Sequence, residues 1–160
     1  MAEKKFTFVV EHLDPELGPW SALEYKTIAE ESREAGCDFV LSSVPASLMA
    51  AEDFKDVKEN ARSDSVESYF ANRKSQICLL DPAASQELCP KDAEKFEIFL
   101  FGGILGDDPP RDRTSELRKK GFEGRRLGPK QMTTDTAVRV TRIVIQEQSG
   151  LLANVVFIIS

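Results

Sequence analysis

A glycine-rich segment is the first place in this chain where residue types and spacing suit chemistry. Residues 101–110 hold three glycines, two aspartates and two prolines within ten positions. Glycine permits a ligand to approach the backbone closely, and adjacent prolines stiffen the exit of a loop. The segment lacks the Gly-Lys-Ser/Thr of a P-loop and the spacing of a dinucleotide fingerprint. It predicts a ligand loop outside those two classes, with a purely structural loop as the equal alternative.

Two further segments, residues 79–82 and 125–135, carry polar groups of interest. Asp81-Pro82 is typical of a turn in which the aspartate bonds to the local backbone. In the second segment, three basic residues gather around Gly128-Pro129, and either threonine at 133–134 can cap a following helix. Capping does not explain the basic cluster. A loop for an anionic ligand and a solvated basic loop therefore both remain open.

Carboxylates near loops or element ends are the candidates for acid–base work, because the chain has a single histidine. His12 directly follows an apolar run, and we expect it to make a structural hydrogen bond rather than to act in catalysis. One histidine and three cysteines without CxxC or zinc-ligand spacing disfavour hydrolase and metalloenzyme functions. The candidate carboxylates are Glu11, Asp14, Asp81, Asp107, Asp108, Asp112 and Asp135.

Alternating apolar and charged segments predict the elements that position these groups. The expected strands are residues 6–10, 37–41, 76–80 and 97–101, with a last apolar stretch at 155–159, and the expected helices are 20–35, 50–74, 112–120 and 136–148. Gly36 and Gly121 predict the ends of two helices. The alternation predicts an α/β fold with a mostly parallel sheet and helices on both faces. Ligands of such sheets bind beyond the carboxyl ends of the strands, where residues 101–110 begin.

Composition narrows the class of protein. The 160 residues are 41% hydrophobic and 30% charged with a net charge of -6, which excludes collagen-like, disordered and coiled-coil chains and disfavours nucleic acid as the main partner. Acidic side chains dominate residues 1–100, whereas residues 101–160 are mildly basic, so a basic protein partner is expected on the acidic part. No stretch suits a membrane span, and the cysteines fit a reduced, cytoplasmic protein. We expect one domain over residues 1–160.

Long motifs of the chain resemble those of one known family. The strings FGGILGDDPPRDRT (101–114) and RRLGPKQMTTDTA (125–137) carry most of the resemblance, and VEH (10–12), LSSVP (41–45) and CLLDP (78–82) extend it. They are similar to the SPOUT-class methyltransferases, and within that class to the fungal protein arginine methyltransferases that modify the small-subunit ribosomal protein uS3. Residues 149–160 match poorly, and we expect this chain to lack the family's C-terminal tail.

The resemblance implies a fold, a cofactor and a substrate. It implies an α/β domain with a trefoil knot near the C-terminus, S-adenosylmethionine held in the knot loops, and a monomeric, cytoplasmic enzyme that methylates arginine in a basic, uS3-like ribosomal protein. An RNA methyltransferase of the same fold and a truncated, non-catalytic binding form are the alternatives. By motif matching, the implied cofactor-binding residues are Leu80, Asp81, Pro82, Phe101, Gly102, Gly103, Ile104, Gly106, Arg126, Leu127, Gly128, Gln131, Met132, Thr133 and Thr134.

An arginine substrate would also need a partner for its guanidinium group. A guanidinium with a pKa above about 12 is a poor nucleophile until one nitrogen is oriented and can lose a proton. A carboxylate that faces the guanidinium would serve both needs. Glu11 and Asp107 are our candidate catalytic residues because each follows a strand that should end near the ligand, with Asp108 and His12 in reserve.

Overall fold

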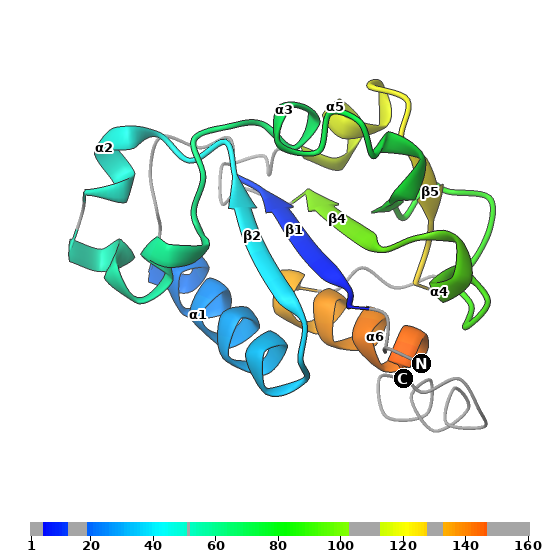
Figure 1. Cartoon of the computed structure of the whole chain (residues 1–160), viewed down its shortest axis with the longest axis horizontal. Helices are drawn as coiled ribbons and strands as arrows, with labels where there is room; N and C mark the ends of the chain where they lie inside the picture. Colours follow the sequence, from blue (N-terminus) through cyan, green and yellow to red (C-terminus); the bar gives the residue numbers. More distant parts are fainter. Residues whose placement is uncertain (1–4, 13–18, 51, 103–112, 128–132, 147–160) are drawn as a thin grey trace.

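Four short apolar runs and one polar segment form a five-stranded sheet in the described part of the chain (Figure 1). The computed structural model describes residues 5–12, 19–50, 52–102, 113–127 and 133–146. The strands are β1 (Thr7–Glu11), β2 (Asp38–Ser42), β3 (Ile77–Leu80), β4 (Ile98–Gly102) and β5 (Glu123–Arg125). All neighbours pair in parallel, in the order β2-β1-β4-β3-β5. The carboxyl ends of the strands therefore meet at one edge of the sheet.

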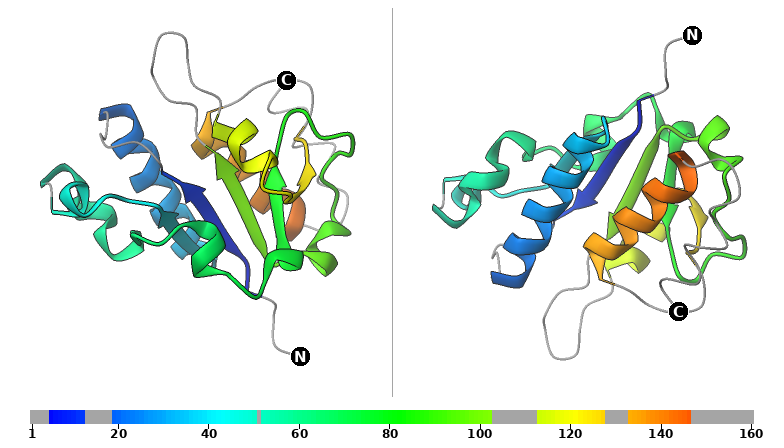
Figure 2. Two further views of the ribbon diagram at one scale, coloured as in Figure 1. Left: turned by 90° about the horizontal axis from the view of Figure 1, so that it is seen from above. Right: turned by 90° about the horizontal axis from the view of Figure 1, so that it is seen from below.

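Helices cover both faces of this sheet. The helices are α1 (Pro19–Glu34), α2 (Ala46–Met49), α3 (Val66–Tyr69), α4 (Asp92–Lys95), α5 (Arg113–Arg118), α6 (Thr134–Gln146) and the 3-10 helices η1 (Glu52–Asn60) and η2 (Lys74–Gln76). Figure 2 shows α1 and α6 side by side on one face, and α3 and α5 lie on the other. Successive strand residues such as Phe8 and Val9 enter opposite cores, because side chains alternate along a strand. The expected α/β fold with helices on both faces is confirmed.

Most of the predicted elements are confirmed, with ends shifted by one or two residues. Gly36 and Gly121 have φ angles of 75° and 87°, the left-handed conformation in which glycine commonly follows a helix. β5 was not predicted, because no apolar run marks it. The expected strand at 155–159 lies outside the described residues, as do parts of the segments in which a knot would form.

The helix predicted over residues 50–74 is wrong. In its place η1 and α3 are separated by an extended link that runs along the outer side of β2. The backbone N–H of Arg62 donates to the carbonyl of Leu41 at 2.8 Å, and the side chain of Asn60 donates to the carbonyl of Phe39 at 3.0 Å. Ser65 then begins α3 by accepting a hydrogen bond from the N–H of Ser68 at 3.2 Å.

A second link covers the opposite edge of the sheet. Residues 86–88 run beside the end of β5, where Glu87 forms a parallel bridge with Arg126. The N–H of Arg126 donates to the carbonyl of Gln86, and the N–H of Leu88 donates to the carbonyl of Arg126, both at 2.9 Å. Loop segments thus pair with backbone groups of β2 at one edge and with Arg126, directly after β5, at the other.

Candidate active site

Glu11 is the last residue of β1, between Ser42 of β2 and Gly102 of β4 in the sheet register. It is only 2% exposed. Its Oε1 accepts hydrogen bonds from the hydroxyls of Ser42 and Ser43 at 2.7 and 2.8 Å, and from the backbone N–H of Val66 at 3.0 Å. Three donors, from the end of β2, the residue after it and the start of α3, therefore fix the position of this carboxylate.

The second oxygen of Glu11 is in a different position. Oε2 is buried and has no hydrogen-bond partner in the described part of the chain. The Nζ of Lys120 lies 4.0 Å away and forms an ion pair with Glu67 at 2.5 Å. The hydrogen bond with Glu67 raises the pKa of Lys120, with the charges of Glu67, Glu11 and Glu116 adding to this effect against the opposing effect of burial. Lys120 is therefore a persistent cation.

Asp81 follows β3 and is 4% exposed. Arg118 donates from Nε to Oδ2 at 2.6 Å and from Nη2 to Oδ1 at 2.7 Å, and the N–H of Ala83 donates to Oδ1 at 2.9 Å. Burial by itself would raise the pKa of Asp81, but the hydrogen bonds from Arg118 and Ala83 lower it overall. Leu80 before it is buried. The Asp81-Pro82 turn thus forms as expected, and its carboxylate holds α5 against the end of β3.

The end of β4 is tied to the same helix. Phe101 is buried in the core under α1 and α6, and Gly102 is half-buried. The hydroxyl of Thr114 in α5 donates to the carbonyl of Gly102 at 3.3 Å. Since α5 also contacts Asp81, one short helix braces the carboxyl ends of two neighbouring strands.

The basic cluster after β5 divides into two kinds of arginine. Arg125 is buried, with ion pairs to Asp92 at 3.2 Å and Glu123 at 2.9 Å. Arg126 has a buried Nε without a hydrogen-bond partner among the described residues, and Leu127 beside it packs half-buried against the core. Arg125 is therefore a structural residue, whereas Arg126 retains an unused donor.

The threonines at 133–134 lie where α6 begins. The hydroxyl of Thr133 donates to the carboxylate of Asp135 at 2.7 Å, and its carbonyl accepts from the N–H of Ala137 at 2.9 Å. Thr133 thus lies at the start of the helix, but the partners of its hydroxyl are the side chains of Asp135 and Thr136, so the predicted side-chain cap to a backbone N–H stays a prediction. Asp135 also faces Glu24 of α1, and burial together with the charge and hydrogen bond of Asp135 raises the pKa of Glu24.

The described site residues gather at the carboxyl edge of the sheet. The register pairs Leu80 with Arg125 and Glu11 with Gly102. The Nδ1 of His12 lies 2.7 Å from the hydroxyl of Tyr25, which confirms the expected structural hydrogen bond. The implied site residues that fall outside the described residues are Gly103, Ile104, Gly106, Asp107, Gly128, Gln131 and Met132, together with the candidates Asp14, Asp108 and Asp112.

Four side chains that contact or neighbour Glu11 were not predicted from the sequence. Ser42 and Ser43 had a usable signal, because two hydroxyl residues follow a predicted strand at its carboxyl end. Lys120 and Glu67 had none, since they come from separate charged segments. Within the described ranges, no group of three or more His, Cys, Asp or Glu side chains could hold a metal ion, and no helix has the length and apolar character needed to cross a membrane.

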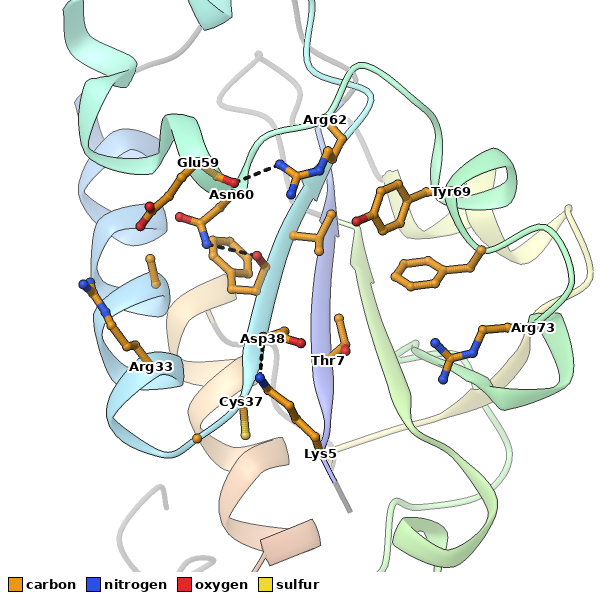
Figure 3. Close-up of a pocket in the computed structure, with 15 residues that line it drawn as sticks. Lys5, Thr7, Arg33, Cys37, Asp38, Glu59, Asn60, Arg62, Tyr69 and Arg73 are labelled. Carbon is orange, nitrogen blue, oxygen red and sulfur yellow. Dashed lines mark hydrogen bonds and ion pairs between the residues drawn. The ribbon is translucent and has the colours of Figure 1, made fainter. Parts of the chain in front are cut away.

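A hollow of about 800 Å³ lies in another part of the sheet (Figure 3). Its lining includes Thr7 and Asp38, the first residues of β1 and β2, with Lys5 paired to Asp38 at 3.1 Å. Arg62 and Tyr69 also line the hollow, and the guanidinium carbon of Arg62 lies 5.8 Å from the ring centre of Tyr69. Thr7 is four residues before Glu11, roughly 13 Å along the strand. The hollow therefore begins at the ends of β1 and β2 that lie opposite Glu11, and its lining continues along the strands to Val40 and to Tyr69 of α3.

Comparisons with known proteins agree on one family. Residues 7–158 match the family described as "Protein arginine N-methyltransferase SFM1-like". The chain is 38% identical over 160 residues to the protein arginine N-methyltransferase SFM1 of Saccharomyces cerevisiae, and the match covers 88% of this chain and 71% of that protein.

Solved structures agree with this match. The crystal structure of yeast SFM1 complexed with SAM has a TM-score of 0.73 at 38% identity over 92% of this chain and 71% of that one. The complex with SAH has a TM-score of 0.74 at 37% identity over 90% and 73%. The structure of spTrm10(74), at 11% identity and a TM-score of 0.70 over 99% and 96%, shows the shared fold alone. The chain therefore belongs to the SFM1-like family of protein arginine N-methyltransferases, whose cofactor is S-adenosylmethionine.

Proposed function

We propose that this chain transfers a methyl group from S-adenosylmethionine to an arginine of a basic, uS3-like protein of the small ribosomal subunit. The observation that carries the proposal is the Glu11 carboxylate, which three donors fix at the carboxyl edge of the sheet while its Oε2 stays without a hydrogen bond. A buried acceptor in this position suits a cationic guanidinium. The acidic excess of residues 1–100 suits a basic protein substrate.

The residues at this edge also fit the cofactor. S-adenosylmethionine presents a carboxylate, ribose hydroxyls and a flat adenine. The buried, unused Nε–H of Arg126 is a donor for an oxygen of such a ligand, and Leu127 offers an apolar surface beside it. Gly102 ends β4 without a side chain that would hinder the approach of a ligand. These residues, with Leu80 and the start of α6, would hold the cofactor, and a trefoil knot through the loops that follow β4 and β5 is part of the proposal.

In methyl transfer, the protein must orient the substrate guanidinium and accept a proton. When bound, S-adenosylmethionine would supply a methyl group on a positively charged sulfur: its C–S bond would break with both electrons left on sulfur, and a nitrogen of the substrate guanidinium would form the new N–C bond. Glu11 orients the guanidinium through Oε2 and takes up the proton that the methylated nitrogen releases. Ser42, Ser43 and the N–H of Val66 keep the carboxylate in place, so orientation is the main contribution of the protein.

An RNA methyltransferase remains the second candidate within this fold. It would rely on the arginines near the cofactor loops, and Arg125 is already paired with Asp92 and Glu123 inside the protein. That pairing reduces the free basic surface and favours the protein substrate. The third candidate is a protein that binds the cofactor or the ribosomal protein without catalysing methylation.

The first experiment is calorimetric titration with S-adenosylmethionine, followed by methylation assays on uS3 and on ribosomal RNA. We expect micromolar binding that Gly103→Val abolishes, methylation of uS3, and a loss of at least about 100-fold in kcat for Glu11→Gln with cofactor affinity unchanged. Methylation of RNA but not of uS3 would refute the proposed substrate. Binding without methylation of either would refute the enzyme and leave the binding form.

We further propose that the protein acts as a monomer in the cytoplasm. Free cysteines at positions 37, 78 and 89 are compatible with a reducing compartment. Light scattering coupled to gel filtration tests the monomer, with a mass near 17.8 kDa expected for this chain. Fluorescence microscopy of the tagged protein tests the location.

A further inference from the structure

Two carboxylates from different elements face one ammonium group under α3 and α5. The Nζ of Lys120 is within 2.5 Å of Oε1 of Glu67 but remains 4.0 Å from Oε2 of Glu11. Glu11 is held in place by its three donors, whereas Glu67 sits on α3 with a side chain that is 45% exposed. The ammonium therefore satisfies one carboxylate and leaves the buried one without a hydrogen bond.

An ammonium and a guanidinium differ in how many carboxylates they can reach at once. An ammonium is a compact point charge, so a single nitrogen must serve both acceptors. A guanidinium is planar and carries five N–H donors on three separate nitrogens. Such a fork can donate to Oε2 of Glu11 from one nitrogen and to Glu67 from another, which a lysine cannot do from the observed position.

We propose that Glu11 and Glu67 form a two-carboxylate clamp for the guanidinium of the substrate arginine, and that Lys120 fills this clamp until the substrate displaces it. The inference rests on the proposed arginine methylation and adds two residues to it. Glu67 binds substrate directly, whereas Lys120 is a built-in competitor that a stronger, bidentate donor replaces.

Exposure shows the order in which the groups are reached. The side chain of Glu11 is fully covered, while those of Lys120 and Glu67 are 36% and 45% exposed. An incoming arginine therefore meets Glu67 and Lys120 before it reaches Glu11. An ion pair this exposed costs little to break, so displacement of Lys120 is not a large barrier. A substrate lysine would gain nothing over Lys120, and the clamp thus selects arginine over lysine.

Steady-state kinetics on the protein substrate test the clamp in the full chain. We expect Glu67→Gln to raise KM for the protein about tenfold or more, with the Kd for S-adenosylmethionine changed less than twofold. Lys120→Met should lower KM several-fold because no cation needs displacing. In the double variant, KM should stay above that of Lys120→Met alone, which isolates the contact made by Glu67 from the effect of Lys120.

The matched control is Glu52→Gln, which removes a carboxylate from the exposed pair of Glu52 and Lys55 at 3.2 Å, with no change in KM expected. An unchanged KM for Glu67→Gln, or a raised KM for Lys120→Met, would overturn the clamp.

A binding experiment without turnover separates the clamp from the proposed function. Methylguanidinium and methylammonium chloride are titrated into the cofactor-loaded protein and followed by amide NMR shifts. We expect methylguanidinium alone to shift the signals of Glu11, Ser43 and Val66, and Glu67→Gln to weaken its binding about tenfold. If wild type binds methylguanidinium in this way but methylates no protein, the proposed function fails and the clamp stands. Equal binding of the two cations, or binding that Glu67→Gln leaves unchanged, refutes the clamp.

Discussion

Replacing Arg118 with alanine tests how the end of β3 is held. The change removes two charge-assisted hydrogen bonds, at 2.6 and 2.7 Å, from an Asp81 carboxylate that is 4% exposed and leaves it only the N–H of Ala83. Hydrogen bonds to charged groups contribute roughly 1.5–3 kcal/mol. Because the side chain of Arg118 is itself 42% exposed, we expect the lower part of that range, about 2 kcal/mol. For a chain of this size that lowers Tm by roughly 4–8 °C.

The pH dependence gives this prediction its sharpest form. The pKa of Asp81 is lowered in the folded protein, so its contribution to stability is present above the ordinary pKa of aspartate and is lost as pH falls through the folded value. Urea unfolding should show a gap between wild type and Arg118→Ala at pH 7 that closes in strong acid. Arg73→Ala is the control, because its bond to Glu97 at 2.6 Å joins two part-exposed groups and should contribute under about 1 kcal/mol. Equal losses for the two variants, or a gap that persists at the lowest pH, would refute the reasoning.

Two further predictions concern other titrating groups. Burial and the charge of Asp135 raise the pKa of Glu24, so its carboxylate opposes folding at neutral pH, and Glu24→Gln should raise Tm by about 1–2 °C at pH 7 but not at pH 3; a lower Tm at pH 7 would contradict this. Burial raises the pKa of Cys78 to about 12, so iodoacetamide at pH 8 should label Cys89 in the native protein and reach Cys78 only after denaturation, as mass spectrometry would show. Native labelling of both thiols at similar rates would count against the buried position of Cys78.

Strands were easiest to predict from the sequence where both faces of the strand are buried. The runs that became β1 and β4 are buried on both faces, so nearly every residue is apolar and the strand is visible without an alternating pattern. By contrast, β5 contains Glu123, Gly124 and Arg125 and belongs to the sheet through its pairing with β3. A Cβ at Gly124 would lie 3.4 Å from the Cβ of Ala84, which is an ordinary contact distance, so the structure does not require glycine there. Pairing with a strand that lies far away in the sequence cannot be read from neighbouring residues.

For the candidate site, the positions of the residues could be predicted from the sequence, but the partners of their side chains could not. Parallel strands bring their carboxyl ends together, and this rule together with the motif resemblance placed Glu11, Asp81 and Gly102 at one edge. The roles of the side chains depended on partners from distant segments. Arg118 engages Asp81, and Lys120 with Glu67 covers Glu11. Such ion pairs depend on how α3 and α5 pack on the sheet, which charge patterns within one segment do not encode.

The two covered sheet edges limit how this protein can associate with others. An open outer strand offers unpaired N–H and C=O groups as a template for another chain, which leads to strand addition or aggregation. Here the carbonyls of Phe39 and Leu41 on β2 already accept hydrogen bonds from residues 60–62, and Arg126 after β5 already pairs with residues 86–88. Association by sheet extension is blocked at these positions. Contacts with a substrate protein at these positions must instead be made by side chains, so single substitutions on the surface can retune them without disturbing the sheet.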